Sequence, residues 1–148
     1  MTLRHHGKMA HDFKNFPELT NGQLQFYYWE SPHKQIMEDF TAEVVGVHDG
    51  DTIKVRWSER VFDFPVRFSN IAAAELDEIG GKEAQEWMEK RIMGKIIDIK
   101  INPKNRVEKW GRLLGAIEEG GMDVGLESVM MGFAKTWDAR AEGTISWP

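Results

Sequence analysis

The stretch VVGVHDGDTIKVRW, residues 44–57, decides the fold. Its valines at 44–47 predict a strand that stops at Asp49-Gly50, a dipeptide typical of tight hairpin turns. Beyond the turn, apolar and polar residues alternate through 52–57, so a second, half-buried strand is expected. The stretch therefore predicts a β-hairpin with its tip at Asp49-Gly50.

The chain after this hairpin repeats the strand pattern and adds two helices. An apolar stripe predicts a third strand over 62–68, with Pro65 indicating an edge or a bulge. Helical spacing of apolar residues over 84–92 predicts an amphipathic helix, followed by strands at 96–101 and 113–117. Asp123 is the expected N-cap of a short helix that runs through Met131. This order predicts a mainly β protein with helices (α+β), a five-stranded OB-type Greek-key barrel with packed helices.

Residues 1–40 lack any sustained period and form an N-terminal arm of unknown role ahead of the domain at 41–148. Asn21-Gly22 is expected to be a turn, and one short helical turn is expected within 34–40. The aromatic run 26–29 is expected either to pack on the main domain or to serve an interface.

Composition excludes several classes of protein. The chain of 148 residues has no cysteine, which excludes disulfide frameworks, thiolate zinc sites and cysteine nucleophiles. It has no phosphate-binding loop of the nucleoside-triphosphatases, no dinucleotide fingerprint and no serine-hydrolase elbow. No apolar run is long enough to span a membrane. A net charge of −5 means that any binding of nucleic acid must depend on a local basic patch.

Two acidic segments carry side chains that suit a metal ion or a general base. Asp49 and Asp51 give the hairpin tip two carboxylates, which suit a calcium ion, although Asp-Gly is equally an ordinary turn. Glu75 follows an apolar stretch and suits a general base, or it is simply an early residue of the next helix. Each segment alone leaves both interpretations open.

Two basic segments complete the pattern. Arg67 falls on the strand face opposite the apolar stripe, on an outer groove wall, where a guanidinium holds phosphate oxygens or is merely solvated. Lys109, Trp110 and Arg112 surround a glycine, a combination that stacks a base and grips a phosphate. Basic loops are more often just solvated, so this segment also has two interpretations.

Taken in order along the chain, these segments resemble the staphylococcal nuclease (thermonuclease-like) family. The resemblance covers roughly residues 41–137 and rests on DGDT at 49–52, VRF at 66–68, AE at 74–75, GKEA at 81–84, KWGRLL at 109–114 and GFA at 132–134. It implies an OB-type barrel with helices beside it. It also implies calcium-dependent hydrolysis of phosphodiester bonds in DNA or RNA.

The resemblance implies a role for each conspicuous side chain outside the hairpin tip. Arg67 and Arg112 correspond to the family's two phosphate-gripping arginines, and Glu75 corresponds to its water-activating glutamate. Lys109 and Trp110 correspond to the basic and aromatic pair that contacts the nucleotide. These five residues form the expected catalytic and substrate-binding set.

The expected metal site departs from the family's pattern. The resemblance implies Asp51 as a calcium ligand, with Asp49 shaping the site and the Ala73 backbone as a further candidate ligand. Ala72 stands where the family has a second metal-binding aspartate, and Ala74 replaces its proline. Because calcium takes six to eight oxygens and its affinity depends on ligand charge, a weak or absent calcium site is expected.

Two functions from different classes follow. The first is a metal-assisted nuclease acting on DNA or RNA, weakened by the loss of one carboxylate at Ala72. The second is an inactive nucleic-acid- or protein-binding module, favoured by Ala72, by the acidic balance and by a chain that ends soon after Lys135, where the family has a long terminal helix. Residues 1–13 lack the apolar stretch of a secretory signal, so a cytoplasmic protein with no membrane partner is expected.

Overall fold

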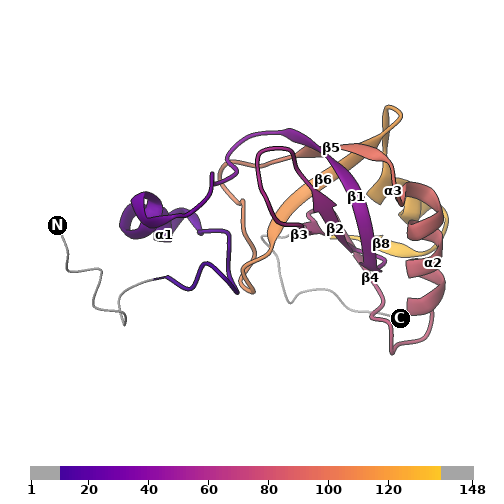
Figure 1. Ribbon diagram of the computed structural model, residues 1–148. Helices are drawn as coiled ribbons and strands as arrows, with labels where there is room; N and C mark the ends of the chain where they lie inside the picture. Colours follow the sequence, from indigo (N-terminus) through magenta and orange to yellow (C-terminus); the bar gives the residue numbers. More distant parts are fainter. Residues whose placement is uncertain (1–10, 138–148) are drawn as a thin grey trace.

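The computed structural model describes residues 11–137, and its centre is a closed β-barrel (Figure 1). Strands β1 (Phe40–Asp49), β2 (Thr52–Arg56) and β3 (Phe64–Phe68) form the expected meander. β5 (Ile96–Lys100) pairs with β1, and β6 (Leu113–Glu119) pairs with β5. A parallel pairing of β3 with β6 closes the barrel. The predicted fold class, an OB-type barrel with packed helices, is confirmed.

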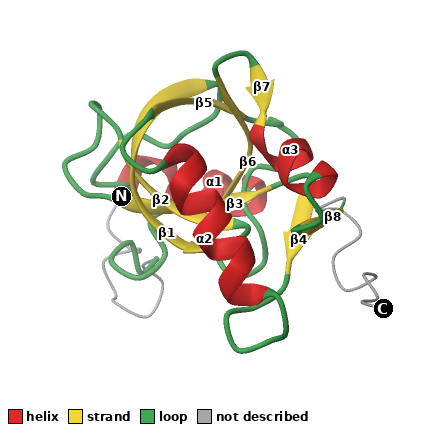
Figure 2. Ribbon diagram, turned by 90° about the vertical axis from the view of Figure 1, so that its right-hand side faces the viewer, coloured by secondary structure: helices red, strands yellow, loops and turns green. Residues whose placement is uncertain are grey.

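Two helices and a small second sheet lie beside the barrel (Figure 2). Helix α2 (Gly81–Ile92) crosses the barrel and buries Ala84, Met88 and Ile92. Helix α3 (Val124–Met130) follows β7 (Met122–Asp123), and the Asp123 carboxylate caps it by accepting from the Leu126 amide at 2.9 Å. β4 (Ile71–Ala73) pairs with β8 (Ala134–Thr136) in the separate two-stranded sheet.

Strand β3 differs from its prediction in two respects. It begins at Phe64 rather than at Phe62, and it is a central strand, because β2 flanks it on one side and β6 on the other. Pro65 pairs with Lys54 of β2, whereas the pairing with β6 starts only at Val66. The missing N–H of the proline therefore costs no hydrogen bond to β6, which is why an interior strand tolerates it.

The arm folds differently from the prediction. No helical turn forms at 34–40; a helix, α1 (Asn21–Tyr27), forms earlier and continues into the 3₁₀ turn η2 (Tyr28–Glu30). The Thr20 hydroxyl accepts from the Gln23 amide, and the Gln23 side chain accepts from the Thr20 amide. This reciprocal capping box starts a helix, so Asn21-Gly22 is its first residue pair and not a turn.

The arm is fastened to the barrel by buried polar contacts. Arg60 and Glu18 form an ion pair in which both side chains are almost completely buried. Arg106, between β5 and β6, donates to the carbonyl oxygens of Ile36 at 2.6 Å and Leu19 at 2.9 Å. The side chains of Leu19 and Ile36 are themselves buried, while α1 stands away from the barrel (Figure 1).

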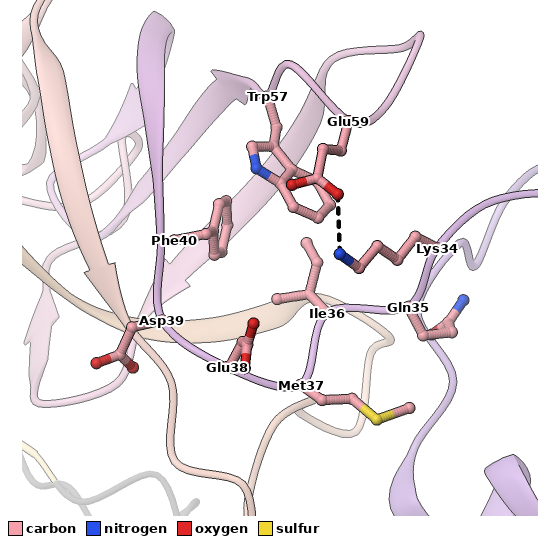
Figure 3. A pocket seen from close by; sticks show the side chains of 9 residues that line it. All are labelled: Lys34, Gln35, Ile36, Met37, Glu38, Asp39, Phe40, Trp57 and Glu59. Atoms are coloured by element: carbon pink, nitrogen blue, oxygen red, sulfur yellow. Dashed lines mark hydrogen bonds and ion pairs between the residues drawn. The ribbon is translucent and has the colours of Figure 1, made fainter.

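A small hollow of about 60 Å³ marks the junction of the arm with β1 and the end of β2 (Figure 3). Its apolar wall includes Phe40 and Trp57, and an ion pair of 2.8 Å between Lys34 and Glu59 spans its edge. No helix within residues 11–137 has the length and apolar character needed to cross a membrane. The expectation of a missing terminal helix concerns the chain after Lys135, of which 138–148 lie outside the described residues.

Candidate functional site

The barrel's closure brings three distant segments to one place. Thr52, at the start of β2, lies opposite Arg67 of β3 in the strand register. Arg67 in turn lies opposite Leu114 of β6, two residues after Arg112. The hairpin tip, the middle of β3 and the start of β6 are therefore neighbours, although up to 60 residues separate them along the chain.

The hairpin tip is held in a fixed conformation by its own carboxylates. Asp49 Oδ1 accepts from the Asp51 amide at 3.0 Å, and Asp51 Oδ2 accepts from the Ala73 amide of β4 at 2.8 Å. A Cβ on Gly50 would lie 2.6 Å from the Ala73 Cβ, closer than carbon atoms approach. Only glycine at position 50 lets β4 pack against the tip and reach Asp51.

Arg67 is buried, whereas an outer groove wall was expected. Its Nη2 lies 3.4 Å from Asp51 Oδ2, and its Nη1 donates to the carbonyl oxygens of Phe68 and Ile71 at 2.6 and 2.8 Å. The Trp137 ring covers the guanidinium, with 4.3 Å from its centroid to the guanidinium carbon. Burial lowers the pKa of Arg67, and the charge of Asp51 opposes that change.

Arg112 is the more accessible arginine. Its Nη1 donates to Thr52 Oγ1 at 3.2 Å and its Nη2 donates to Glu108 Oε2 at 3.1 Å. Burial acts to lower the pKa of Arg112, but the hydrogen bond and charge of Glu108 outweigh it and raise that pKa. Within the described part of the chain, the buried Nε–H of Arg112 has no partner. The Arg112 side chain as a whole is 32% exposed, so part of its guanidinium is accessible to an anionic ligand.

The carboxylates of Asp49 and Asp51 offer oxygen ligands to a hard cation. Burial, chiefly, raises the pKa of Asp51 to about 6; Arg67 opposes the rise and Asp49 adds to it. Two crowded, desolvated carboxylates fit calcium as donors, but Ala72 is buried and contributes no side-chain oxygen. No group of three or more histidine, aspartate or glutamate side chains among residues 11–137 is arranged to hold a metal. The donor set therefore fits at most a two-carboxylate site.

Glu75 lies on the loop between β4 and α2. It is exposed in the turn before α2, so it is not a helical residue, and its amide donates to Glu78 Oε1 at 2.6 Å. The turn is so tight that a Cβ on Gly81 would lie 1.8 Å from the Glu75 carbonyl oxygen. Among the described residues, the carboxylate of Glu75 has no hydrogen-bond or ion-pair partner, so it is accessible to solvent.

Lys109 and Trp110 lie on the loop that leads into β6. Trp110 is 65% exposed, and Lys109 Nζ lies 5.3 Å from the centroid of its ring. Gly111 has a φ of +85°, a left-handed conformation that favours glycine. Two residues after the exposed Trp110, Arg112 points its guanidinium at Thr52.

Sequence reasoning missed two members of the cluster. Glu108 orients Arg112 from four residues earlier, and its side chain is buried. A glutamate four residues before an arginine is a signal that the sequence alone could have supplied. Trp137 is 70 residues from Arg67 and has no local motif that would have marked it. Its position depends on the β4–β8 pairing, extended by a hydrogen bond of 2.9 Å from the Trp137 amide to the Asn70 carbonyl oxygen.

Comparison with models of known protein families and with curated proteins finds none that matches this chain. The resemblance to staphylococcal nucleases therefore depends on the short sequence segments quoted above.

Proposed function

We propose that the protein hydrolyses phosphodiester bonds in DNA or RNA as a weakened nuclease of the staphylococcal nuclease type. One observation carries the proposal: Arg67 and Arg112 converge on Asp51 and Thr52 at one end of an OB-type barrel. Two guanidinium groups beside acidic oxygens suit a bound phosphodiester and the extra negative charge that develops during its cleavage.

The two arginines would contribute differently. Arg112 is half-buried, and its side chain is 32% exposed, so the accessible part of its guanidinium can donate to a phosphate oxygen. Arg67 already donates to two carbonyl oxygens and faces Asp51. Its role would be a fixed positive charge held beside the phosphate, at no cost of reorganisation during the reaction.

Asp51 and Asp49 would hold the calcium ion. When bound, the cation supplies positive charge that neutralises phosphoryl oxygens and helps to ionise water. With Ala72 in place of an aspartate, fewer ligand charges favour the ion. Weak calcium affinity and a high calcium requirement are therefore expected.

Glu75 would act as the general base that takes a proton from the attacking water. Its exposed carboxylate is available to solvent, and a general base needs a separation of about 2.6–3.2 Å from the oxygen that it deprotonates. Substrate-free sites are often looser than reacting ones. The tight turn before α2 supports this role because it fixes the backbone of Glu75 at the edge of β4.

The test is cleavage of single-stranded DNA in millimolar calcium, stopped by a chelator. Glu75→Gln and Arg112→Ala should each lower the rate by about 10²–10³, the usual effect of losing one such group. Lys90→Ala, on the last turn of α2, is the matched control and should cleave like wild type. Unchanged cleavage in both site variants would refute the assigned roles.

A catalytically inactive binding module is the second candidate. It is favoured by the isolation of Glu75 and by the contacts that Asp51 already makes with Arg67 and the Ala73 amide. Such a module would bind thymidine 3′,5′-bisphosphate without cleaving DNA in any divalent ion. Arg112→Ala should then abolish that binding, whereas Glu75→Gln should leave it intact.

A further inference from the structure

A second hollow, of about 260 Å³, lies between the arm and the loop before β6. The arm contributes one wall and the loop contributes the other; the lining includes His11, Phe16, Thr20, Gln23, Glu108 and Lys109. Figure 1 shows the orange segment between β5 and β6 beside the arm, where Arg106 fastens the two together. The wall that the arm contributes thus lies outside the part of the chain that the staphylococcal nuclease resemblance covers.

The hollow shares a wall with the arginine cluster. Glu108 lines it, and the same carboxylate receives the hydrogen bond from Arg112 at 3.1 Å. Lys109, also in its wall, is directly followed by the exposed ring of Trp110. A single strand whose phosphate lies at Arg112 therefore has a continuous route across this loop into the hollow.

The rings and amide of the hollow suit a nucleobase. Phe16 is 45% exposed and packs on Gly111, where an added Cβ would lie 2.8 Å from a ring carbon. The Gln23 side-chain oxygen accepts from the Thr20 amide at 3.0 Å, and its NH₂ group donates to none of the described residues. An aromatic face for stacking and an amide donor for a base edge are the usual means of holding an unpaired base.

The charges of the hollow do not suit a phosphate. Its two carboxylates, Glu18 and Glu108, are each paired with an arginine, Arg60 and Arg112 respectively. Among the described residues that line the hollow, Lys109 is the only lysine or arginine, so they form no cluster of positive charge to hold an anion. The volume is also below the roughly 300–1,000 Å³ of sites for drug-sized ligands, so it matches one planar ring system.

We propose that the hollow is a second nucleotide subsite, which takes the base adjoining the nucleotide held at the arginines. This inference rests on the proposed function and names its substrate more closely: a single strand of at least two nucleotides. The arm, through Phe16 and Gln23, is then part of the substrate-binding surface.

The experiment compares two ligands, fluorescein-labelled oligothymidylate of eight nucleotides and thymidine 3′,5′-bisphosphate, which reaches only the arginine site. Phe16→Leu keeps an apolar contact with Gly111 but removes the ring, and Gln23→Glu keeps the capping acceptor but removes the NH₂ donor. Each should weaken oligothymidylate binding at least about fivefold, which corresponds to ~1 kcal/mol: Phe16→Leu through lost base stacking, and Gln23→Glu through a lost hydrogen bond. Bisphosphate affinity should change by less than about twofold, because the smaller ligand makes no contact there.

The matched control is Phe26→Leu, at a residue of α1 that is 73% exposed and does not line the hollow. It should bind both ligands like wild type. The salt dependence of oligothymidylate binding should keep its slope in Phe16→Leu, since stacking releases no counterions.

The outcomes separate the two proposals. If wild type binds neither ligand, the proposed function and this inference both fail. If wild type binds both ligands and the Phe16 and Gln23 variants bind oligothymidylate equally well, only the second subsite is refuted. Should Phe16→Leu melt at a lower temperature than wild type, Gln23→Glu, which retains the capping box, decides the matter.

Discussion

At the scale of single residues, Asp51 sets the cost of burying a carboxylate against the attraction of a nearby arginine. Its carboxylate is buried and faces both Asp49 and Arg67, and burial raises its pKa from 3.8 to about 6. The folded protein therefore binds this proton more tightly than the unfolded chain does. The stability linked to it is fully present below about pH 4 and is lost as pH rises to about 6.

Asp51→Asn should remove this loss of stability with rising pH. The asparagine side chain stays neutral, and its oxygen can still accept the hydrogen bond from the Ala73 backbone amide. Without calcium, the variant's free energy of unfolding relative to wild type should increase between pH 4 and 6. The increase should be on the order of 3 kcal/mol, reduced by the lost ion pair with Arg67. Urea denaturation at several pH values measures it, and a difference that does not vary with pH would contradict the assignment.

Ala72 is the residue whose replacement tests the metal site most directly. Ala72→Asp restores a third carboxylate, so calcium affinity should rise by about tenfold or more, since affinity follows the charge of the ligand set. The apo variant should be less stable than wild type, because position 72 is buried. Calorimetric titration with calcium measures the affinity; Ala72→Asn, which adds no charge, is the control. No gain for Ala72→Asp would mean that position 72 does not face the hairpin tip.

At the scale of elements, the turn between β4 and α2 determines where Glu75 lies. Gly81→Ala would place a methyl 1.8 Å from the Glu75 carbonyl oxygen, so the turn must open. We expect a loss of about 1–3 kcal/mol of stability and a fall in DNA cleavage similar to that of Glu75→Gln. Gly46→Ala, whose added methyl would lie at an ordinary 3.5 Å from Lys54 Cβ, is the control and should retain cleavage. Full cleavage by Gly81→Ala would show that the position of Glu75 does not matter for cleavage.

Elements were predictable from the sequence where one local pattern dominates. The hairpin tip, α2 and the Asp123 cap followed from turn residues, helical spacing and capping chemistry. Helix α1 was missed because Gly22 reads as a turn, although Thr20 and Gln23 carry a complete capping box. The cover that Trp137 gives Arg67 was beyond prediction, because it arises from pairing between strands far apart in the chain.

At the scale of the whole molecule, buried polar contacts join the arm to the barrel. Arg106 and Arg60 each bind the arm from the barrel, and Leu19 is buried in the arm itself. The Leu19 amide donates to the Gln35 side chain at 2.8 Å inside the arm. In native-state hydrogen exchange, the Leu19 amide should therefore exchange only through global unfolding, as barrel amides such as that of Val44 do.

Glu18→Ala tests this coupling, because it leaves the Arg60 guanidinium buried without its partner. Losing one member of a buried ion pair costs about 3–5 kcal/mol, so a single, strongly destabilised unfolding transition is expected. The control is Glu59→Ala, which removes the exposed pair with Lys34 and should cost no more than about 1 kcal/mol. Replacing both Glu18 and Arg60 by apolar residues should recover much of the lost stability, since no unpaired charge then remains. Two separate transitions, with the barrel as stable as in wild type, would show that the arm folds independently.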